Sequence, residues 1–383
     1  MTVTENVTRN HRDLGLGDEE LLRLYRLMLT ARRMDDRMWA LQRQGRAAFV
    51  VGSSGHEAIQ VASVFALDTD KDWVLPYYRD MGVGLAWGFS PYEVFLAVFA
   101  KADDPTSGGR QLPNHWSDPD RRVFTQSSVI GTEFPHAAGI AHGLQIQGSD
   151  AVVVVYGGEG ATSEGDWHEA MNWAGIHKLP LICVIENNQY AISVPLEEQV
   201  AGSVAERARG YGFPGYRIDG NDVFEVLATM REAVERARAG EGPTIVEALT
   251  YRYYAHTSDD NDSLYRDKEE VERWRKKDPL ARLRSYLIEN RLLTEDDEMA
   301  MDQEVVAELM EAVEQAEAAP DPDQPLTHVY RNPIEPSEPA TAPEPAPTGD
   351  TVNLITAVNR ALHEILEAHD DAVVFGEDVA RRK

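Results

Sequence analysis

Two polar groups in the chain have the types and the spacing to bind a divalent cation together. Glu159 stands in a glycine-rich segment, GGEG, and Asn188 follows 29 positions later in the segment ENN. A carboxylate, an amide oxygen and phosphate oxygens form a ligand set that Mg²⁺ prefers. Either segment alone is equally typical of an exposed turn, so the prediction of a metal site depends on the pair.

The predicted secondary structure around Glu159 and Asn188 indicates that these two side chains lie close together in the fold. Apolar runs at Ala151–Tyr156 and Leu181–Ile185 precede the two polar segments. Such runs are typical of strands buried on both faces, as in a parallel sheet. Between them, Ser163 is the predicted N-cap of a helix, with Asp166 in the capping-box position. This βαβ unit would bring both groups to the carboxyl edge of the sheet, where α/β proteins bind ligands and a helix N-terminus favours phosphate.

The paired segments resemble the thiamine diphosphate motif, in which Gly-Asp-Gly is followed by Asn-Asn after about 30 residues. The whole stretch resembles the alpha subunit of the decarboxylase component of 2-oxo acid dehydrogenase complexes, and most closely the branched-chain (2-oxoisovalerate) type. The resemblance implies an α/β thiamine diphosphate-binding fold, a mostly parallel sheet with helices on both faces. Glu159 replaces the usual Asp, as it does in branched-chain members.

The resemblance also implies the ligands of the cofactor and the metal. The carboxylate of Glu159, the side chain of Asn188 and the backbone carbonyl of Tyr190 would hold Mg²⁺. The backbone of Gly160 and Ala161 would contact the diphosphate of thiamine diphosphate.

Two further segments would contact the cofactor. In the segment WVLPYYRD, Tyr78 and Arg79 could belong to an ordinary surface salt-bridge site. Arginine, however, suits a phosphate best, and the resemblance places both residues on the terminal phosphate. In the segment SSVIGT, the resemblance assigns Ser128 to the aminopyrimidine ring and Ile130 to the wedge that bends the cofactor. No potassium site is predicted, because Glu133 replaces the glutamine of that site.

The segment YRYYAHTSDDNDSLYR could be a polar surface loop, but the family has a cofactor-facing histidine here. The resemblance implies that His256 contacts the phosphate and acts catalytically in handing the acyl group to lipoamide, for which an ordinary pKa near neutrality would suit proton transfer. Arg252 would order the loop. Phosphorylation of Thr257 or Ser258 stays open, and His115 is interpreted as a loop-packing residue.

Two positions leave the subtype open. Branched-chain relatives can have Gln at the position of Tyr77 and Arg at the position of Glu186, whereas pyruvate-type relatives have Glu at the latter. A pyruvate or acetoin dehydrogenase alpha subunit therefore stays an alternative. A stand-alone decarboxylase would need its own pyrimidine-binding domain, which the sequence does not contain, and an inactive cofactor-binding fragment ranks lowest.

Composition excludes some classes of function. The formal net charge is −28, with 65 acidic and 37 basic residues, which argues against binding to nucleic acid or to an anionic membrane. A single cysteine, Cys183, permits no disulfide framework. The N-terminus lacks an apolar signal segment, and we expect a cytoplasmic protein.

The sequence predicts four segments. Residues 320–350 hold nine of the 20 prolines, a composition typical of an extended linker. An apolar helical stripe runs from Leu354 to Leu366, followed by a short strand at Ala372–Phe375, and this tail resembles the start of a beta subunit, cut off at Lys383. The segments are a flexible arm (1–17), the thiamine diphosphate domain (18–319), the linker (320–350) and the truncated start of a beta-subunit-like pyrimidine-binding domain (351–383).

The expected function follows from the resemblance. Thiamine diphosphate would decarboxylate a 2-oxo acid oxidatively and pass the acyl group to a lipoyl group, with this chain binding the diphosphate and Mg²⁺. The expected partners are a beta subunit or fused beta domain, which carries the activating glutamate, a lipoyl-bearing acyltransferase, and a small 2-oxo acid, in an α₂β₂-type assembly.

Overall fold

The computed structural model describes residues 10–324, 326 and 351–374. The chain divides into two units, Met1–Leu326 and Thr327–Lys383, and each is described by itself. Among the described residues no helix is long and apolar enough to cross a membrane.

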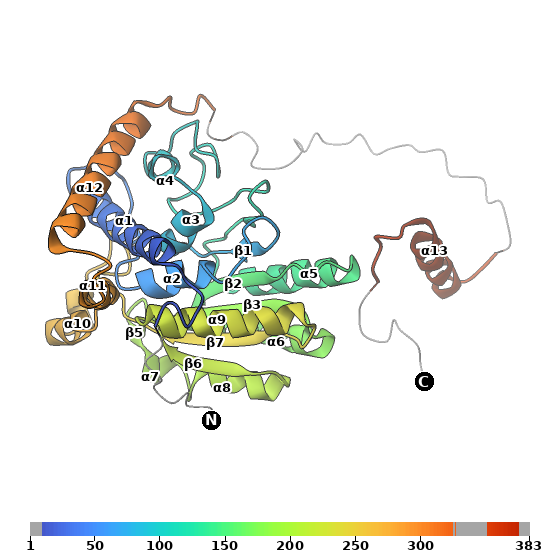
Figure 1. Cartoon of the computed structure of the whole chain (residues 1–383). Coiled ribbons are helices and arrows are strands. Elements are labelled where there is room, and N and C mark those ends of the chain that lie inside the picture. Colours follow the sequence, from blue (N-terminus) through green and yellow to red (C-terminus); the bar gives the residue numbers. More distant parts are fainter. Residues whose placement is uncertain (1–9, 325, 327–350, 375–383) are drawn as a thin grey trace. The chain divides into compact units, whose positions relative to one another are not determined.

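The first unit is built on a sheet of five parallel strands in the order β1-β2-β3-β7-β6 (Figure 1). The strands are β1 (Trp73–Leu75), β2 (Val153–Gly158), β3 (Leu181–Asn187), β6 (Gly215–Asp219) and β7 (Thr244–Leu249). A small antiparallel hairpin, β4 (Tyr190–Ala191) and β5 (Val194–Pro195), follows β3. The predicted parallel α/β class is confirmed.

Helices cover both faces of this sheet, as predicted. One face packs against α1 (Asp18–Arg43), α2 (Glu57–Val64), α3 (Met81–Trp87) and α9 (Val223–Arg238), with α4 (Pro91–Val98), α11 (Pro279–Glu289) and α12 (Glu295–Ala318) joining the same core. The other face packs against α5 (Glu133–Ile146), α6 (Gly165–His177) and α8 (Val204–Arg207). The short elements are α7 (Leu196–Gln199), α10 (Lys268–Arg275), η1 (Glu159–Ser163), η2 (Ala208–Tyr211) and η3 (Asp262–Leu264).

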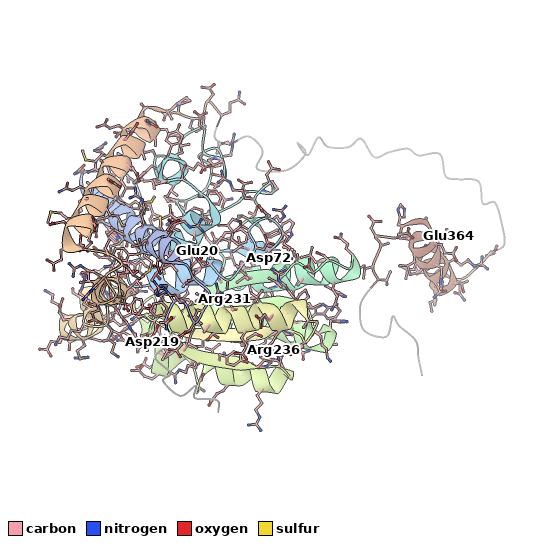
Figure 2. All side chains as sticks on the ribbon, in the orientation of Figure 1. Glu20, Asp72, Asp219, Arg231, Arg236 and Glu364 are labelled. Carbon is pink, nitrogen blue, oxygen red and sulfur yellow. The ribbon has the colours of Figure 1, made fainter. Side chains whose placement is uncertain are left out.

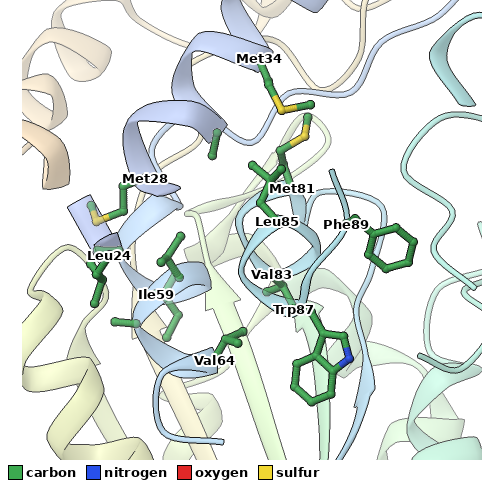
Figure 3. Packing of buried hydrophobic residues seen from close by; sticks show 14 of the residues in the cluster. Leu24, Met28, Met34, Ile59, Val64, Met81, Val83, Leu85, Trp87 and Phe89 are labelled. Carbon is green, nitrogen blue, oxygen red and sulfur yellow. The ribbon is translucent and has the colours of Figure 1, made fainter. Parts of the chain in front are cut away.

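The alternation of side-chain direction along the central strands explains why the unit has one hydrophobic core on each face of the sheet. In β2, Val154 and Tyr156 enter the core on the α1 side, while Val153 and Val155 enter the core on the α6 side. Successive side chains of a strand point to opposite faces, so a strand covered on both faces has to be apolar throughout. Figure 3 shows the first core, where Met28 of α1 and Ile59 of α2 are buried.

The predicted helix start at Ser163 is wrong. Ser163 is the last residue of η1, and α6 begins at Gly165 after an extended Glu164. The chain forms a 3₁₀ turn directly after β2, closed by the Glu164 N–H donating to the Ala161 carbonyl. The predicted capping box therefore runs from the end of this turn into the first turn of α6, and Glu164 rather than Ser163 is the N-cap.

The described part of the predicted flexible arm, from residue 10, is packed rather than loose. The imidazole of His11 is hydrogen-bonded to the Tyr286 hydroxyl at 2.8 Å, and Leu16 is buried in the first core. Figure 2 labels Glu20, whose carboxylate accepts the Gly17 N–H at 2.9 Å and so closes the start of α1. The hydrogen bond of His11 joins residues 275 positions apart, which local sequence patterns do not reveal.

In the second unit the predicted helix is confirmed as α13 (Leu354–Ala368). The side chain of Asn353 caps it by accepting the Thr356 N–H at 2.9 Å. Its apolar residues are exposed, for example Leu354 and Ile355. Residues 372–374 form no strand, and Phe375 lies outside the described residues.

Gly55 provides a test of the loop that joins α1 to α2. It has φ +100°, and a Cβ there would lie 2.0 Å from the Tyr251 carbonyl oxygen. Gly55→Ala is expected to lower the free energy of unfolding by about 2 kcal/mol or more, through backbone strain and this clash. Gly143→Ala in α5, where a Cβ meets open space, should change it by less than about 1 kcal/mol, in the stabilising direction. Urea denaturation measures both, and equal effects would contradict the geometry.

Candidate active site

A cavity of about 570 Å³ lies beyond the carboxyl ends of the parallel strands. Four neighbouring strands, β1, β2, β3 and β7, each end just before residues that line it. Every residue predicted for the site lines this one cavity: Tyr78, Arg79, Ser128, Ile130, Glu159, Gly160, Ala161, Asn188, Tyr190, Arg252 and His256. The structure thus brings the predicted residues together, while their roles stay predictions.

The predicted metal ligands lie side by side after β2 and β3. One carboxylate oxygen of Glu159, Oε2, accepts the Asn188 N–H at 3.1 Å, whereas Oε1 is buried without a hydrogen-bond partner among the described residues. Burial raises the pKa of Glu159 to about 7. An unpartnered buried carboxylate oxygen is costly, and a bound cation would remove this cost. Glu159, with the amide oxygen of Asn188 nearby, therefore fits Mg²⁺.

A buried network fixes the Asn-Asn turn. The Glu247 carboxylate on β7 accepts from the Asn187 side-chain amide at 2.8 Å and from the Ala205 N–H at 2.9 Å. Asn187 in turn accepts the Gln189 N–H at 3.3 Å, where the backbone adopts φ +77°. The turn that carries Asn188 is therefore positioned from the neighbouring strand.

Glycine is required at position 160 because the β4–β5 hairpin lies very close to its backbone. A Cβ on Gly160 would lie 2.9 Å from the Cβ of Ala191 in the hairpin. Its carbonyl accepts from the Gln199 side-chain amide at 3.0 Å. A side chain at position 160 would therefore push the hairpin away from the backbone of Gly160 and Ala161, which lines the cavity.

Two arginines at the site are almost completely buried. Arg79 and Arg252 are each 1% exposed. Within the described part of the chain neither pairs with a carboxylate within 4.0 Å, and backbone carbonyls of Gly52 and Ile192 accept from them instead. Burial, together with the charge of Arg79, lowers the pKa of Arg252 to about 10. Two uncompensated buried cations beside a cavity form a site for an anion.

His256 lies between these arginines. Its Nδ1 is 3.3 Å from an Arg79 nitrogen and 3.5 Å from an Arg252 nitrogen. Burial and then the two positive charges lower the pKa of His256 to about 3, although the charge of Asp260 opposes this. The expected pKa near neutrality is therefore wrong for the free site, because the loop sequence gives no sign of the arginine charges.

His115 is buried and hydrogen-bonded within its loop, as its interpretation as a packing residue implies, but it also makes a contact at the site. It lines the cavity, and its Nε2 is hydrogen-bonded to the hydroxyl of Ser128. Burial lowers the pKa of His115. His115 therefore fixes the side chain that the sequence predicted to contact the aminopyrimidine ring.

Several cavity residues were not found by sequence reasoning. They come from the loop before α2, from the segment 112–133 and from the hairpin: Phe49, Val51, Leu112, Gln126, Glu133 and Ile192. Glu133 is buried, which raises its pKa to about 7. The apolar residues among them could not be recognised as cavity residues from the sequence, because apolar residues in a sequence usually indicate a hydrophobic core.

Tyr77 and Glu186, the two positions that left the subtype open, contact each other. The Tyr77 hydroxyl donates to the Glu186 carboxylate at 3.2 Å, and the Gln60 amide donates to the same oxygen at 3.0 Å. Burial raises the pKa of Glu186 to about 7 and that of neighbouring Asp80 well above its ordinary value. Tyr77 lines the cavity and Glu186 does not, so the two departures form one buried contact that runs from the cavity wall to the residue behind it.

The fold and the cavity define an α/β protein with a site suited to an anion and a divalent cation at the carboxyl edge of its sheet. Residues 25–324 match the family model described as dehydrogenase E1 component. The chain belongs to this family, and the assignment to the alpha subunits of branched-chain 2-oxo acid dehydrogenases is confirmed.

Comparison with individual relatives supports the same family. The chain is 48% identical over 326 residues to 2-oxoisovalerate dehydrogenase subunit alpha of Bacillus subtilis, covering 84% of this chain and 99% of the relative. It is 42% identical over 327 residues to 3-methyl-2-oxobutanoate dehydrogenase subunit alpha of Mycobacterium tuberculosis, covering 84% and 85%. It is 39% identical over 307 residues to the pyruvate dehydrogenase E1 component subunit alpha of Bacillus subtilis, covering 80% of each.

The raised pKa of Glu159 predicts a pH-dependent stability. Because the folded-state pKa is about 7 against an ordinary 4.5, this carboxyl stabilises the metal-free fold below pH 4.5, and the contribution is lost as the pH rises through 7. Glu159→Gln should therefore gain stability relative to wild type by about 2 kcal/mol between pH 5 and pH 8. Urea denaturation at both values tests this, with exposed Glu314→Gln as the matched control; a pH-independent difference would contradict it.

Proposed function

We propose that this chain is the cofactor-binding alpha part of a dehydrogenase that oxidatively decarboxylates a branched-chain 2-oxo acid of the 2-oxoisovalerate type. The acyl group would be transferred to a lipoyl group, with thiamine diphosphate supplying the carbanion chemistry. The observation that carries the proposal is the cavity itself, where two buried arginines and the Glu159 carboxylate converge; within the described ranges no carboxylate pairs with these arginines and one oxygen of Glu159 has no partner.

The residues of the cavity divide the cofactor between them. Arg79, Arg252 and His256 would bind the diphosphate, assisted by Tyr78 and by the backbone of Gly160 and Ala161. Glu159, Asn188 and the carbonyl of Tyr190 would hold Mg²⁺. Ser128 and Ile130 would contact the ring system. Carboxylate and amide oxygens beside buried arginines support this division.

A second polypeptide would complete the site. The rim of the cavity includes the exposed aliphatic side chains of Leu112, Ile130 and Ile192. Exposed apolar residues around a binding cavity are typical of a protein interface. We assign this rim to a beta subunit that brings the pyrimidine-binding half, in an α₂β₂-type assembly served by a lipoyl-bearing acyltransferase. A cytoplasmic location stays a prediction, as does the lack of nucleic-acid and membrane binding.

We further propose that residues 351–383 begin a beta-subunit-like domain, joined by the proline-rich linker 320–350 to the cofactor domain at 18–319. The apolar stripe of α13 supports this, because a helix with such a stripe needs a partner surface. For the residues 327–350 and 375–383, which lie outside the described ranges, this proposal rests on the amino-acid sequence alone.

Calorimetric titration of thiamine diphosphate with Mg²⁺ tests the cofactor assignment. Wild type should bind in a Mg²⁺-dependent manner, Glu159→Gln should lose the metal dependence, and Arg79→Gln should weaken binding by about tenfold or more because a charged hydrogen bond is lost. Exposed Arg209→Gln is the matched control for loss of one positive charge. The titration is repeated with a beta subunit present; no binding in either case would refute the proposal.

A pyruvate-type enzyme is the second candidate, favoured by the Tyr77–Glu186 contact and by the pyruvate-type relative. With beta subunit, lipoyl domain and cofactors added, kcat/KM for 2-oxoisovalerate should exceed that for pyruvate. We expect a ratio of about ten or more, because burying additional methyl groups favours the larger substrate. A ratio below one would assign the pyruvate type instead.

A further inference from the structure

The imidazole of His256 receives two hydrogen-bond donors on the same nitrogen. Guanidinium nitrogens of Arg79 and Arg252 lie 3.3 and 3.5 Å from Nδ1. A guanidinium group has no acceptor and does not lose its proton in proteins. Nδ1 must therefore be the acceptor in both contacts, and the proton of a neutral ring must lie on Nε2.

We infer that Arg79 and Arg252 hold His256 as the neutral Nε2–H tautomer, so that His256 offers the cavity a hydrogen-bond donor and no basic nitrogen. The inference deepens the proposed function and rests on it for the identity of the anion. Besides the diphosphate contact proposed for it, Arg252 thereby also positions His256.

The remaining surroundings of the ring agree. The carboxylate of Asp260 accepts the backbone N–H of His256 at 2.7 Å, so it is engaged by the main chain rather than by the ring. The Tyr78 ring stands edge-on at 6.1 Å between centroids. The pKa of about 3 keeps the imidazole neutral throughout the range in which histidine ordinarily titrates.

The loop geometry fixes the position of the donor. Arg252 donates to the Ile192 carbonyl at 2.8 Å and to the Tyr265 hydroxyl at 3.0 Å, and Tyr265 donates to Asp260. The arginine is therefore anchored to the hairpin on one side and to the histidine loop on the other. Among the described residues none is hydrogen-bonded to Nε2 of His256, which leaves its N–H available to a phosphate oxygen.

NMR of the full chain with ¹⁵N-labelled histidine tests the tautomer directly. The chain has 11 histidines, and the signals missing from His256→Gln assign this one. In wild type the proton should couple to Nε2, Nδ1 should resonate as an unprotonated nitrogen, and neither should titrate between about pH 5 and pH 8. An Nδ1–H signal, or titration in this range, would overturn the inference.

Two variants at position 252 separate charge from packing. Arg252→Gln removes a cation, and His256 should then titrate closer to its ordinary pKa of about 6.5. Arg252→Lys keeps a cationic donor and should keep His256 neutral across the same range. If the glutamine variant behaves as wild type while circular dichroism shows it folded, the positioning role of Arg252 is refuted.

Replacements at position 256 test the donor. The amide nitrogen of glutamine reaches about as far as Nε2, whereas that of asparagine ends near the position of Nδ1. With Mg²⁺ and inorganic pyrophosphate as the probe, His256→Gln should bind within about threefold of wild type and His256→Asn about tenfold more weakly. Equal losses, or the reverse order, would contradict the tautomer.

The outcomes of these experiments distinguish the proposed function from the proposed tautomer of His256. An Nε2–H histidine in a chain that binds neither pyrophosphate nor thiamine diphosphate, with or without a beta subunit, would leave the tautomer correct and the proposed function wrong. Tight Mg²⁺-dependent binding by a chain with Nδ1–H would leave the function standing and overturn the tautomer.

Discussion

The structure of the site depends on two buried guanidinium groups that no described carboxylate neutralises. Removing such a charge from water costs several kcal/mol unless hydrogen bonds replace the lost hydration. The fold replaces it with backbone carbonyls: Gly52 accepts from Arg79, while Ile192 and Tyr254 accept from Arg252. The loop before α2, the β4–β5 hairpin and the loop after β7 are therefore held around the cations. Carbonyls position the charges without cancelling them, which leaves the positive potential available to an anion.

The sheet brings the opposite charge to the same edge. Glu159 follows β2 and Asn188 follows β3, between the arginines that follow β1 and β7. Adjacent parallel strands place their carboxyl ends together, so residues far apart in the sequence meet without long loops. Glu247 adds rigidity, because its buried carboxylate uses both oxygens to fix the Asn187 turn and the start of α8.

Sequence reasoning found the parts of the site that local patterns determine. Apolar runs and the helical spacing between them predicted β2, α6 and β3, and the polar ends of these strands predicted Glu159 and Asn188. It failed where the cause is non-local. The 3₁₀ turn at Ser163 and the two arginine charges around His256 depend on tertiary contacts. The apolar lining from Phe49 and Val51 has the same composition as core, so only the folded chain shows that these residues face a cavity.

Tyr77 and Glu186 show why single positions gave a mixed subtype signal. They are separated by 109 residues, yet one hydrogen bond joins them, and Gln60 holds the same carboxylate. A buried carboxyl needs its donors, so Glu at 186 requires a donor such as the Tyr77 hydroxyl. An arginine at 186 would instead donate to that hydroxyl, which can also accept, and would place a positive charge close to Arg79. The hydrogen bond therefore couples the two positions, and they count as one structural difference, with Tyr77 at the cavity and Glu186 behind it, rather than as two independent indications of substrate.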